Sequence, residues 1–474
     1  MNYVFYDFET SGMDVSFDQP IQIAATLVDE NLNILETLNE RCYLRDGVIP
    51  HPKALLITKV GIDSLKNGQS FYEMMKKIHT KFQSWSPSVF IGYNSIWFDE
   101  EVLRNSLFQS LFDPYLTISN ENSRADLYKM VIALNGLNLD LINIPIDNKT
   151  EKKVFKLTSL SEANNIQHEM AHDALSDVMA TIELAKIIQN KDSSFWETCL
   201  KARSARTLSE FLQSDEYFFS APIASNSNKY CPITFITANP NYNKELAFFD
   251  LNHDPEKYLE TRISGIISLI ESKQKIIRLI KSNRFPIILN TGYLEKINFC
   301  KEELDHKLYR ERVRKIKTNE SFIERVNQSL VDRWEETQAD YLPSDYPEKQ
   351  IYQKFLGNED KSKMKDFNNS SNPINKIKIC SQLNDDRLRH FANKIIYDEY
   401  PDELTERERK KNQLLIAEKA LSEDKNVPWC TITKAKESIE SIRSSNEYQD
   451  QKDYIDQIEG FIKSEEKKYK KYIA

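Results

Sequence analysis

The sequence predicts an α+β protein of several domains, and three observations support this fold class. The chain has 474 residues, too long for one ordinary domain, and 40% of them are hydrophobic, enough for more than one core. In its first part, strand-like segments come before helix-like segments, whereas its end is charged and mostly helix-like. We therefore expect a mixed sheet covered by helices, an α+β middle and a helical C-terminal part.

The first domain is expected over residues 1–190. Apolar and β-branched runs predict strands that fit an antiparallel opening and one later strand, at 2–9, 21–29, 41–44 and 88–93. Helical periodicity predicts helices at 70–84, 98–110, 124–135, 158–164 and 173–189. Strands first, with helices around them, favour an RNase H-like mixed sheet.

The second domain is expected over residues 193–345. Its short apolar runs CPITFIT, LAFFDL and FPIILN are bounded by Asn, Pro and Ser, which is typical of strands. Helical segments near 257–275 and 301–335 are mixed with them. The residues alone therefore establish only an α+β region here.

The third domain is expected over residues 348–474 and is mostly helical. Thr405 and Glu408 offer a capping box before an apolar run. Residues 358–374 are polar and contain Asn, Ser and Pro, so we expect a flexible linker there.

Four acidic residues and one histidine carry the functional signal. Asp7 and Glu9 stand two apart in the strand-like VFYDFET, so both side chains project from one face. The apolar residues around them suggest a buried strand, where carboxylates are costly unless they are paired or metal-bound. Asp99 follows WF, and His172 precedes Asp177 on an amphipathic helix. Each residue alone could have a purely structural role. Asp7 and Glu9 could be solvated charges, Asp99 an acid in the first turn of a helix, and His172 a core histidine.

Together these five residues predict a two-metal nuclease. In-line hydrolysis of a phosphodiester uses two divalent cations about 3.5–4 Å apart. Mg²⁺ prefers oxygen ligands, so the four carboxylates are the candidate ligands of two Mg²⁺ ions, with Mn²⁺ as an alternative. An imidazole with an ordinary pKa of about 6.5 suits a general base, which we assign to His172.

Longer strings around these residues resemble a known family. YDFETSG, FIGYNSIWFDEEVLRN, FDPY, NSRADL and FKLTSLSEANNIQHEMAHDALSDVMATIELAK are similar to bacterial exonuclease I of the DEDDh superfamily. A weaker likeness at IYQKFLGNEDKSKMK and RLRHFANKIIYDEYPDELT extends it over nearly the whole chain. The resemblance implies an exodeoxyribonuclease I that shortens single-stranded DNA from its 3′ end to 5′-mononucleotides in DNA repair and recombination. It also implies an SH3-like barrel within residues 193–345.

The resemblance assigns roles by position. Asp7, Glu9, Asp99 and Asp177 match the metal-site acids, and His172 matches the histidine required for activity. Substrate contacts are expected from the following residues: Glu9, Arg104, Tyr115, Arg124 and Lys156. Lys156 stands where the family often has arginine, and lysine keeps the charge but loses the planar fork that grips phosphate.

Other DNA-contacting residues are weighed against plainer roles. Trp97 and Phe8 are candidate base-stacking rings, with core packing as the alternative. The net charge of −8 does not exclude DNA binding, because a groove needs only a local basic lining. Lys281 and Arg284 are candidates for that lining, whereas the basic run 309–317 reads better as a solvated helix face.

Cellular context and partners follow from what the sequence contains. Six scattered cysteines form no C-x-x-C pair, and neither a signal peptide nor a membrane-length apolar run is visible, which predicts a cytoplasmic protein. The resemblance implies that it is bacterial. We expect a monomer that binds single-stranded DNA, with the acidic tail of single-stranded DNA-binding protein as a candidate partner implied by the resemblance. Two alternatives stay open: a ribonuclease of the same superfamily, and a non-catalytic scaffold that binds DNA.

Overall fold

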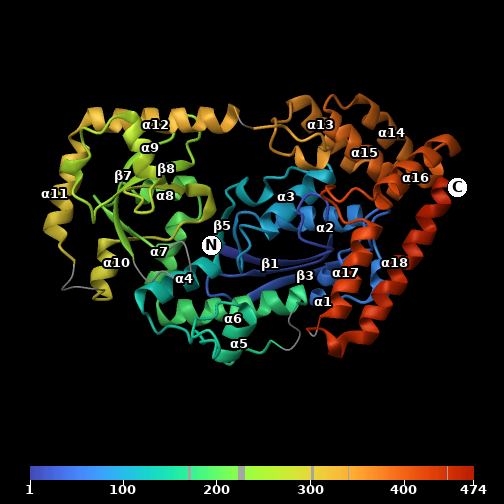
Figure 1. The fold of residues 1–474 in the computed structure, drawn as a ribbon, viewed down its shortest axis with the longest axis horizontal. Helices are drawn as coiled ribbons and strands as arrows, with labels where there is room; N and C mark the ends of the chain where they lie inside the picture. Colours follow the sequence, from blue (N-terminus) through green and yellow to red (C-terminus); the bar gives the residue numbers. More distant parts are fainter. Residues whose placement is uncertain (169–171, 222–229, 300–303, 340, 446) are drawn as a thin grey trace.

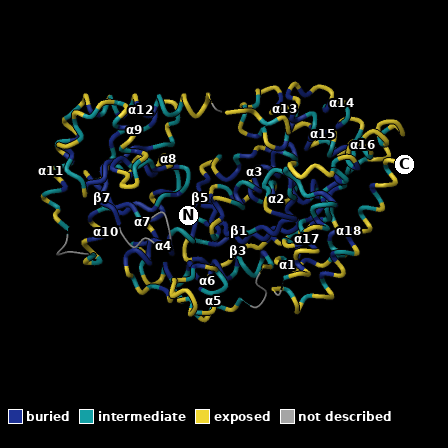
Figure 2. Tube along the Cα trace, in the orientation of Figure 1, coloured by how far each residue is buried: buried dark blue, intermediate teal, exposed yellow. Residues whose placement is uncertain are grey.

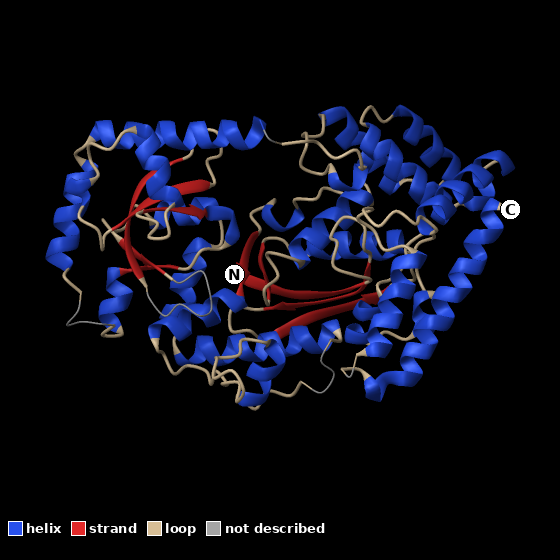
Figure 3. Ribbon diagram, viewed as in Figure 1, coloured by secondary structure: helices blue, strands red, loops and turns tan. Residues whose placement is uncertain are grey.

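The computed structural model describes residues 1–168, 172–221, 230–299, 304–339, 341–445 and 447–474. Two five-stranded sheets and a group of C-terminal helices lie side by side (Figures 1 and 3). The sheet formed by β1–β5 is central, the sheet formed by β6–β10 lies on one side of it, and helices α13–α18 lie on the other. Among the described helices, none combines the length and the apolar character needed to cross a bilayer.

The central sheet has the strand order β3-β2-β1-β4-β5. β1 pairs antiparallel with β2 and parallel with β4, so the predicted mixed sheet with an antiparallel opening is confirmed. Its strands are β1 (Asn2–Thr10), β2 (Pro20–Val28), β3 (Ile34–Arg41), β4 (Ser88–Gly92) and β5 (Ser123–Asp126).

Helices cover both faces of this sheet. Successive residues of a strand point to opposite faces, and β1 buries Phe5 against one apolar cluster and Val4 against another. The first cluster includes Val178 of α6, and the second includes Met75 of α2. The helices of this part are α1 (Pro52–Thr58), α2 (Phe71–Ser84), α3 (Asp99–Gln109), α4 (Leu127–Leu137), α5 (Leu157–Ala163), α6 (Ala174–Lys191), α7 (Ser193–Cys199) and α8 (Ala205–Phe211).

Two elements of the central part differ from the prediction. The third strand is Ile34–Arg41, not 41–44, because this edge strand is mostly exposed and lacks the apolar alternation of a half-buried strand. The predicted helix 124–135 begins as strand β5, and α4 starts only at Leu127. The Asp126 side chain accepts a hydrogen bond from the Tyr128 backbone N–H, which caps the helix at that point.

The second sheet has the order β10-β6-β7-β8-β9, and all its pairs are antiparallel. The α+β middle region is therefore confirmed. Within the described residues no pair joins the edge strands β9 and β10, so the expected barrel has no closing pair there. The elements are β6 (Phe218–Ser220), β7 (Cys231–Ala238), β8 (Glu245–Asp250), β9 (Ile277–Lys281), β10 (Ile288–Asn290), α9 (Ile263–Glu271), α10 (Thr291–Lys296), α11 (His306–Lys317) and α12 (Glu320–Ala339).

The C-terminal part is helical, as predicted, but the expected linker at 358–374 is wrong. That segment forms α13 and the start of α14, because Met364 and Phe367 lie three residues apart and are both buried on one face of the helix. The helices are α13 (Asn358–Asn369), α14 (Pro373–Gln382), α15 (Asp386–Glu399), α16 (Glu406–Ala420), α17 (Ile432–Ser444) and α18 (Lys452–Ile473).

Buried residues lie in the interior of the central sheet region and of the parts on either side of it (Figure 2). The apolar ones form clusters that extend across the expected domain boundaries. Phe108 of α3 packs edge-to-face against Phe391 of α15, with ring centroids 5.6 Å apart. Asn368 of α13 accepts a hydrogen bond from the Tyr72 hydroxyl and donates one to the Leu111 carbonyl. The C-terminal helices are therefore built onto the central sheet region.

Candidate active site

The five predicted catalytic residues come from three elements that meet at one end of β1. Asp7 and Glu9 stand two positions apart near the end of this strand. Asp99 is the first residue of α3, and its Oδ1 accepts a hydrogen bond from the Phe8 backbone N–H at 3.2 Å. That bond fixes the start of α3 beside β1.

Helix α6 and the segment just before it supply the other two residues, Asp177 and His172. The helix packs on β1 and β2 through its buried apolar face, and Asp177 lies in its first turn. The Asp173 side chain caps the helix by accepting from the Ser176 N–H, and it also pairs with Arg41 at 2.6 Å. His172, just before the helix, is exposed and adopts a left-handed backbone conformation with φ of 66°.

A group of possible metal-binding atoms is present in this cluster. A ring nitrogen of His172 and carboxylate oxygens of Glu9 and Asp177 all lie within 4.8 Å of one another. Asp7 lies close enough to Asp99 for the charge of the Asp99 carboxylate to raise the pKa of Asp7. The structure thus brings the predicted acids and the predicted histidine together.

The electrostatics of the cluster favour a bound cation. Burial, then the carboxylates of Asp99 and Glu9, raise the pKa of Asp7 well above its ordinary value. Burial and the nearby Asp177 and Asp99 carboxylates raise the pKa of Glu9 to about 9. Burial also raises the pKa of Asp99 to about 7. Crowded buried carboxylates of this kind are satisfied by a divalent ion, whose charge removes the repulsion, and their oxygens suit Mg²⁺.

A second histidine that the sequence analysis did not identify also reaches the cluster. His168 Nε2 forms a hydrogen bond with Asp177 Oδ1, and its side chain is only 4% exposed. Burial raises the pKa of Asp177, and the His168 bond opposes that rise. The available signal was the first histidine in HEMAH, four residues before His172.

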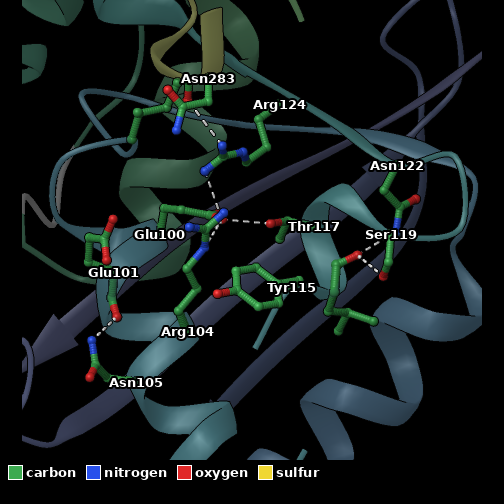
Figure 4. A network of polar contacts seen from close by, with 12 residues as sticks. Glu100, Glu101, Arg104, Asn105, Tyr115, Thr117, Ser119, Asn122, Arg124 and Asn283 are labelled. Atoms are coloured by element: carbon green, nitrogen blue, oxygen red, sulfur yellow. Dashed lines mark hydrogen bonds and ion pairs between the residues drawn. The ribbon is translucent and has the colours of Figure 1, made fainter. Parts of the chain in front are cut away.

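Arg104 and Arg124, predicted as substrate contacts, are engaged within the protein by buried Glu100 (Figure 4). Glu100 Oε1 lies 2.8 Å from Arg104 Nε and 2.9 Å from an Arg124 terminal nitrogen, and accepts from the Thr117 hydroxyl at 2.7 Å. Burial alone would raise the pKa of Glu100, but the Arg124 and Arg104 charges outweigh it and lower that pKa. Both arginines therefore hold α3 in place.

The other predicted contacts differ in accessibility. Tyr115 lies beneath the Arg104 guanidinium, with 5.3 Å between the guanidinium carbon and the ring centroid. Lys156 is exposed at the start of α5, and among the described residues no partner is recorded for its ammonium. It is thus the cation of the predicted set that is free to meet a phosphate.

The two candidate stacking rings differ clearly in exposure. Phe8 is buried beside Tyr6 in the core, so core packing is its role. Trp97 is 62% exposed, two residues before Asp99, with the Arg284 guanidinium 4.5 Å from its ring centroid. The nearby Tyr352 hydroxyl donates to Glu101 of α3.

The basic residues predicted beyond the active site also differ from one another in their surroundings. Arg284 lies beside Trp97, as noted, whereas Lys281 is exposed at the end of β9. The run 309–317 lies within α11, where Val313 and Ile316 are buried and Lys315 pairs with Glu256 at 2.8 Å. This arrangement is the amphipathic helix with a solvated charged face that the sequence predicted.

Comparisons with known proteins identify the family of this chain. Residues 4–185 match a family model described as exonuclease, and residues 345–465 match one described as exonuclease I C-terminal domain. Exodeoxyribonuclease I of Buchnera aphidicola subsp. Schizaphis graminum is 31% identical over 406 residues, covering 82% of each chain. Two solved structures share the fold, each with a TM-score of 0.81. Exonuclease I from Methylocaldum szegediense is 22% identical and covers 100% of both chains. Exonuclease I from Escherichia coli, in complex with a dA16 oligonucleotide, is 21% identical and covers 99% of both. The chain belongs to the exodeoxyribonuclease I family.

Proposed function

We propose that the chain is a Mg²⁺-dependent 3′→5′ exonuclease that degrades single-stranded DNA to 5′-mononucleotides. The observation that carries this proposal is the convergence of Glu9, His172 and Asp177, with Asp7 and Asp99 beside them, at one end of β1. When bound, two divalent ions supply activation of a water molecule and stabilisation of the leaving oxygen. Asp7, Glu9, Asp99 and Asp177 would hold those ions.

The protein's own residues then divide the work. His172 is exposed beside Glu9 and Asp177, so its neutral imidazole can take a proton from the attacking water. His168 is a positioning residue, because its hydrogen bond fixes the orientation of the Asp177 carboxylate. Glu9 would also contact the terminal nucleotide of the substrate, as the family resemblance implies.

Single-stranded DNA would reach this site along a surface that exposes aromatic rings. Trp97 and Tyr352 are exposed near the start of α3, and Phe355 is 91% exposed a few residues further on. Base stacking on such rings is tolerant of sequence and favours unpaired strands. Lys156 would contact a phosphate, whereas Arg104, Tyr115 and Arg124 would support this surface from beneath.

We further propose that residues 1–190 perform the chemistry and that 193–345 and 348–474 help to guide the strand. Single-stranded DNA-binding protein, through its acidic tail, and a role in DNA repair and recombination remain predictions from the family resemblance. A monomer is sufficient for this proposal, because all five catalytic side chains come from one chain.

The test is digestion of 5′-labelled single-stranded DNA, matched RNA and duplex DNA by the purified protein in Mg²⁺, with an EDTA control. Shortening of single-stranded DNA from its 3′ end, lost in EDTA and in Asp177→Ala, is the expected result. Preferred cleavage of RNA would instead indicate a ribonuclease of the superfamily. DNA binding without cleavage under any of these conditions would indicate a scaffold.

A further inference from the structure

A cavity lies away from the carboxylate cluster, where the segment after β3 meets the C-terminal helices. Its volume is about 450 Å³, which is within the range of small-molecule sites. Its walls include Arg45 from the segment after β3, Lys66 from the segment before α2, Asp398 of α15, and Phe461 and Lys468 of α18. A molecule in it would touch both the central region and the C-terminal helices.

Arg45 is the main polar feature of this cavity, and it is held rigidly. Its side chain is 8% exposed, its Nε donates to Asp398 Oδ2 at 2.8 Å, and its guanidinium carbon lies 5.2 Å from the Phe71 ring centroid. Its Nη2 is buried, yet no hydrogen-bond partner is recorded among the described residues. A buried donor without a partner costs free energy, so a ligand acceptor at this position would recover it.

The balance of donors and acceptors indicates which ligand fits. The three acids of the wall are already engaged: Asp398 by Arg45, Asp46 by Lys468 and the Tyr397 hydroxyl, and Glu465 by the Tyr469 hydroxyl. Lys66 is exposed, with its ammonium 5.0 Å from the Phe461 ring centroid, and no carboxylate is paired with it in the described part of the chain. The unused groups are therefore cationic donors.

We propose that this cavity binds a small phosphate monoester through Arg45 and Lys66. A planar guanidinium fixed by an ion pair and a flexible ammonium together suit phosphate oxygens. The shared chemistry is the phosphate group, which could come from inorganic phosphate or from a free 5′-mononucleotide. This site is independent of the proposed nuclease function.

The site is also linked to the catalytic strand. The Arg45 backbone N–H donates to Gln19 Oε1 at 3.0 Å, and the Gln19 N–H donates to the Ser11 hydroxyl at 2.9 Å, two residues after Glu9. A bound phosphate would thus hold together the C-terminal helices and the segment that follows Glu9.

The test is isothermal titration of the full chain with inorganic phosphate, dTMP and thymidine, in EDTA and at constant ionic strength. EDTA leaves the carboxylate cluster without a divalent ion, so that cluster repels phosphate. We expect saturable binding of dTMP, of phosphate or of both, and none of thymidine. Binding of phosphate assigns the site to the free ion, and binding of dTMP alone assigns it to the mononucleotide.

Two variants locate the binding. Lys66→Met removes a charge from an exposed side chain, and it should weaken binding at least about tenfold. Lys53→Met, exposed on α1 and outside the cavity, should bind as the wild type does. The proposal is overturned if neither phosphate ligand binds, if thymidine binds as well as dTMP, or if Lys66→Met leaves the affinity unchanged.

Discussion

His168 and Asp177 share a hydrogen bond between the imidazole Nε2 and a carboxylate oxygen, across nine positions of sequence. His172 lies between them in sequence, and its ring reaches the same carboxylate group and Glu9. Two histidines thus serve one acid, and their accessibility differs, because the His168 side chain is nearly buried and His172 is exposed. This difference supports the positioning role proposed for His168 and the chemical role proposed for His172.

Substitution of the two histidines should therefore have different effects. His168→Ala should weaken Mn²⁺ binding about 10- to 100-fold, as is typical when a partner of a metal ligand is lost. His168→Gln should retain much of the affinity, because its amide can donate from a similar position. His172→Ala should lower kcat about 10²- to 10⁴-fold with little change in Mn²⁺ affinity. Mn²⁺ titration by electron paramagnetic resonance, together with kcat, checks this. Unchanged Mn²⁺ affinity in His168→Ala would remove the positioning role.

The metal-free protein should lose stability as the pH rises. The pKa of Glu9 is raised to about 9 and that of Asp99 to about 7, whereas both are near 4 in an unfolded chain. Between those values the unfolded state has released protons that the folded state still holds, so rising pH favours unfolding. Urea unfolding in EDTA at pH 5, 7 and 9 measures this loss.

A matched pair of variants assigns that loss to the carboxylate cluster. Glu9→Gln should flatten the pH dependence, whereas Glu197→Gln, exposed on α7, should keep the wild-type slope. Added Mg²⁺ should restore stability most at high pH, where the acids are charged. Equal slopes for the wild type and Glu9→Gln would contradict the assignment.

Loss of Glu100 should destabilise the fold strongly. Glu100→Ala would leave Arg104 and Arg124 buried without their shared counter-charge, at a cost of about 3–5 kcal/mol. Glu183→Ala, which removes an exposed pair with Lys186 on α6, should cost no more than about 1 kcal/mol. Urea denaturation followed by circular dichroism gives both values. A Glu100→Ala variant as stable as Glu183→Ala would show that the arginines find other partners.

Trp97 should contribute to substrate binding and leave the chemistry unaffected. Its exposed ring lies beside Asp99, and loss of one stacking contact costs about 1–3 kcal/mol. Trp97→Ala should therefore raise KM for single-stranded DNA about fivefold or more, while Trp97→Phe should retain part of the contact. Steady-state digestion of an oligonucleotide ladder measures KM and kcat separately. A wild-type KM in Trp97→Ala would exclude the ring from the DNA path.

The sequence pointed to the acids that meet at the end of β1 but not to their supporting partners, and α3 shows why. Asp99, Glu100 and Glu101 are consecutive acids, yet successive helical residues point in different directions. Asp99 turns to the Phe8 N–H, Glu100 to Arg124 and Arg104, and Glu101 to Tyr352. These partners are distant in sequence, so composition and spacing alone could not distinguish the buried acid from its neighbours.

The same limitation explains the errors in the fold. Strand β1 and helix α6 were predictable because apolar residues recur on them with the correct period. Residues 358–374 were expected to be a linker from their polar composition, although Met364 and Phe367 provide a short buried face. Whether so few apolar residues are enough to hold a helix against its neighbours depends on what packs against them. The local sequence does not contain that information.

The shared core of α3 and α15 has a consequence for how this protein can be recombined. Phe108 and Phe391 pack together, and Asn368 bonds to Tyr72 and Leu111, so each side of this seam is shaped to the other. Contacting positions couple energetically, and substitutions on one side alone leave voids or clashes on the other. A chimera that exchanges residues after 345 with those of a relative about 30% identical would inherit a mismatched seam. The C-terminal helices and the nuclease sheet should therefore be inherited together, as one unit of evolutionary exchange.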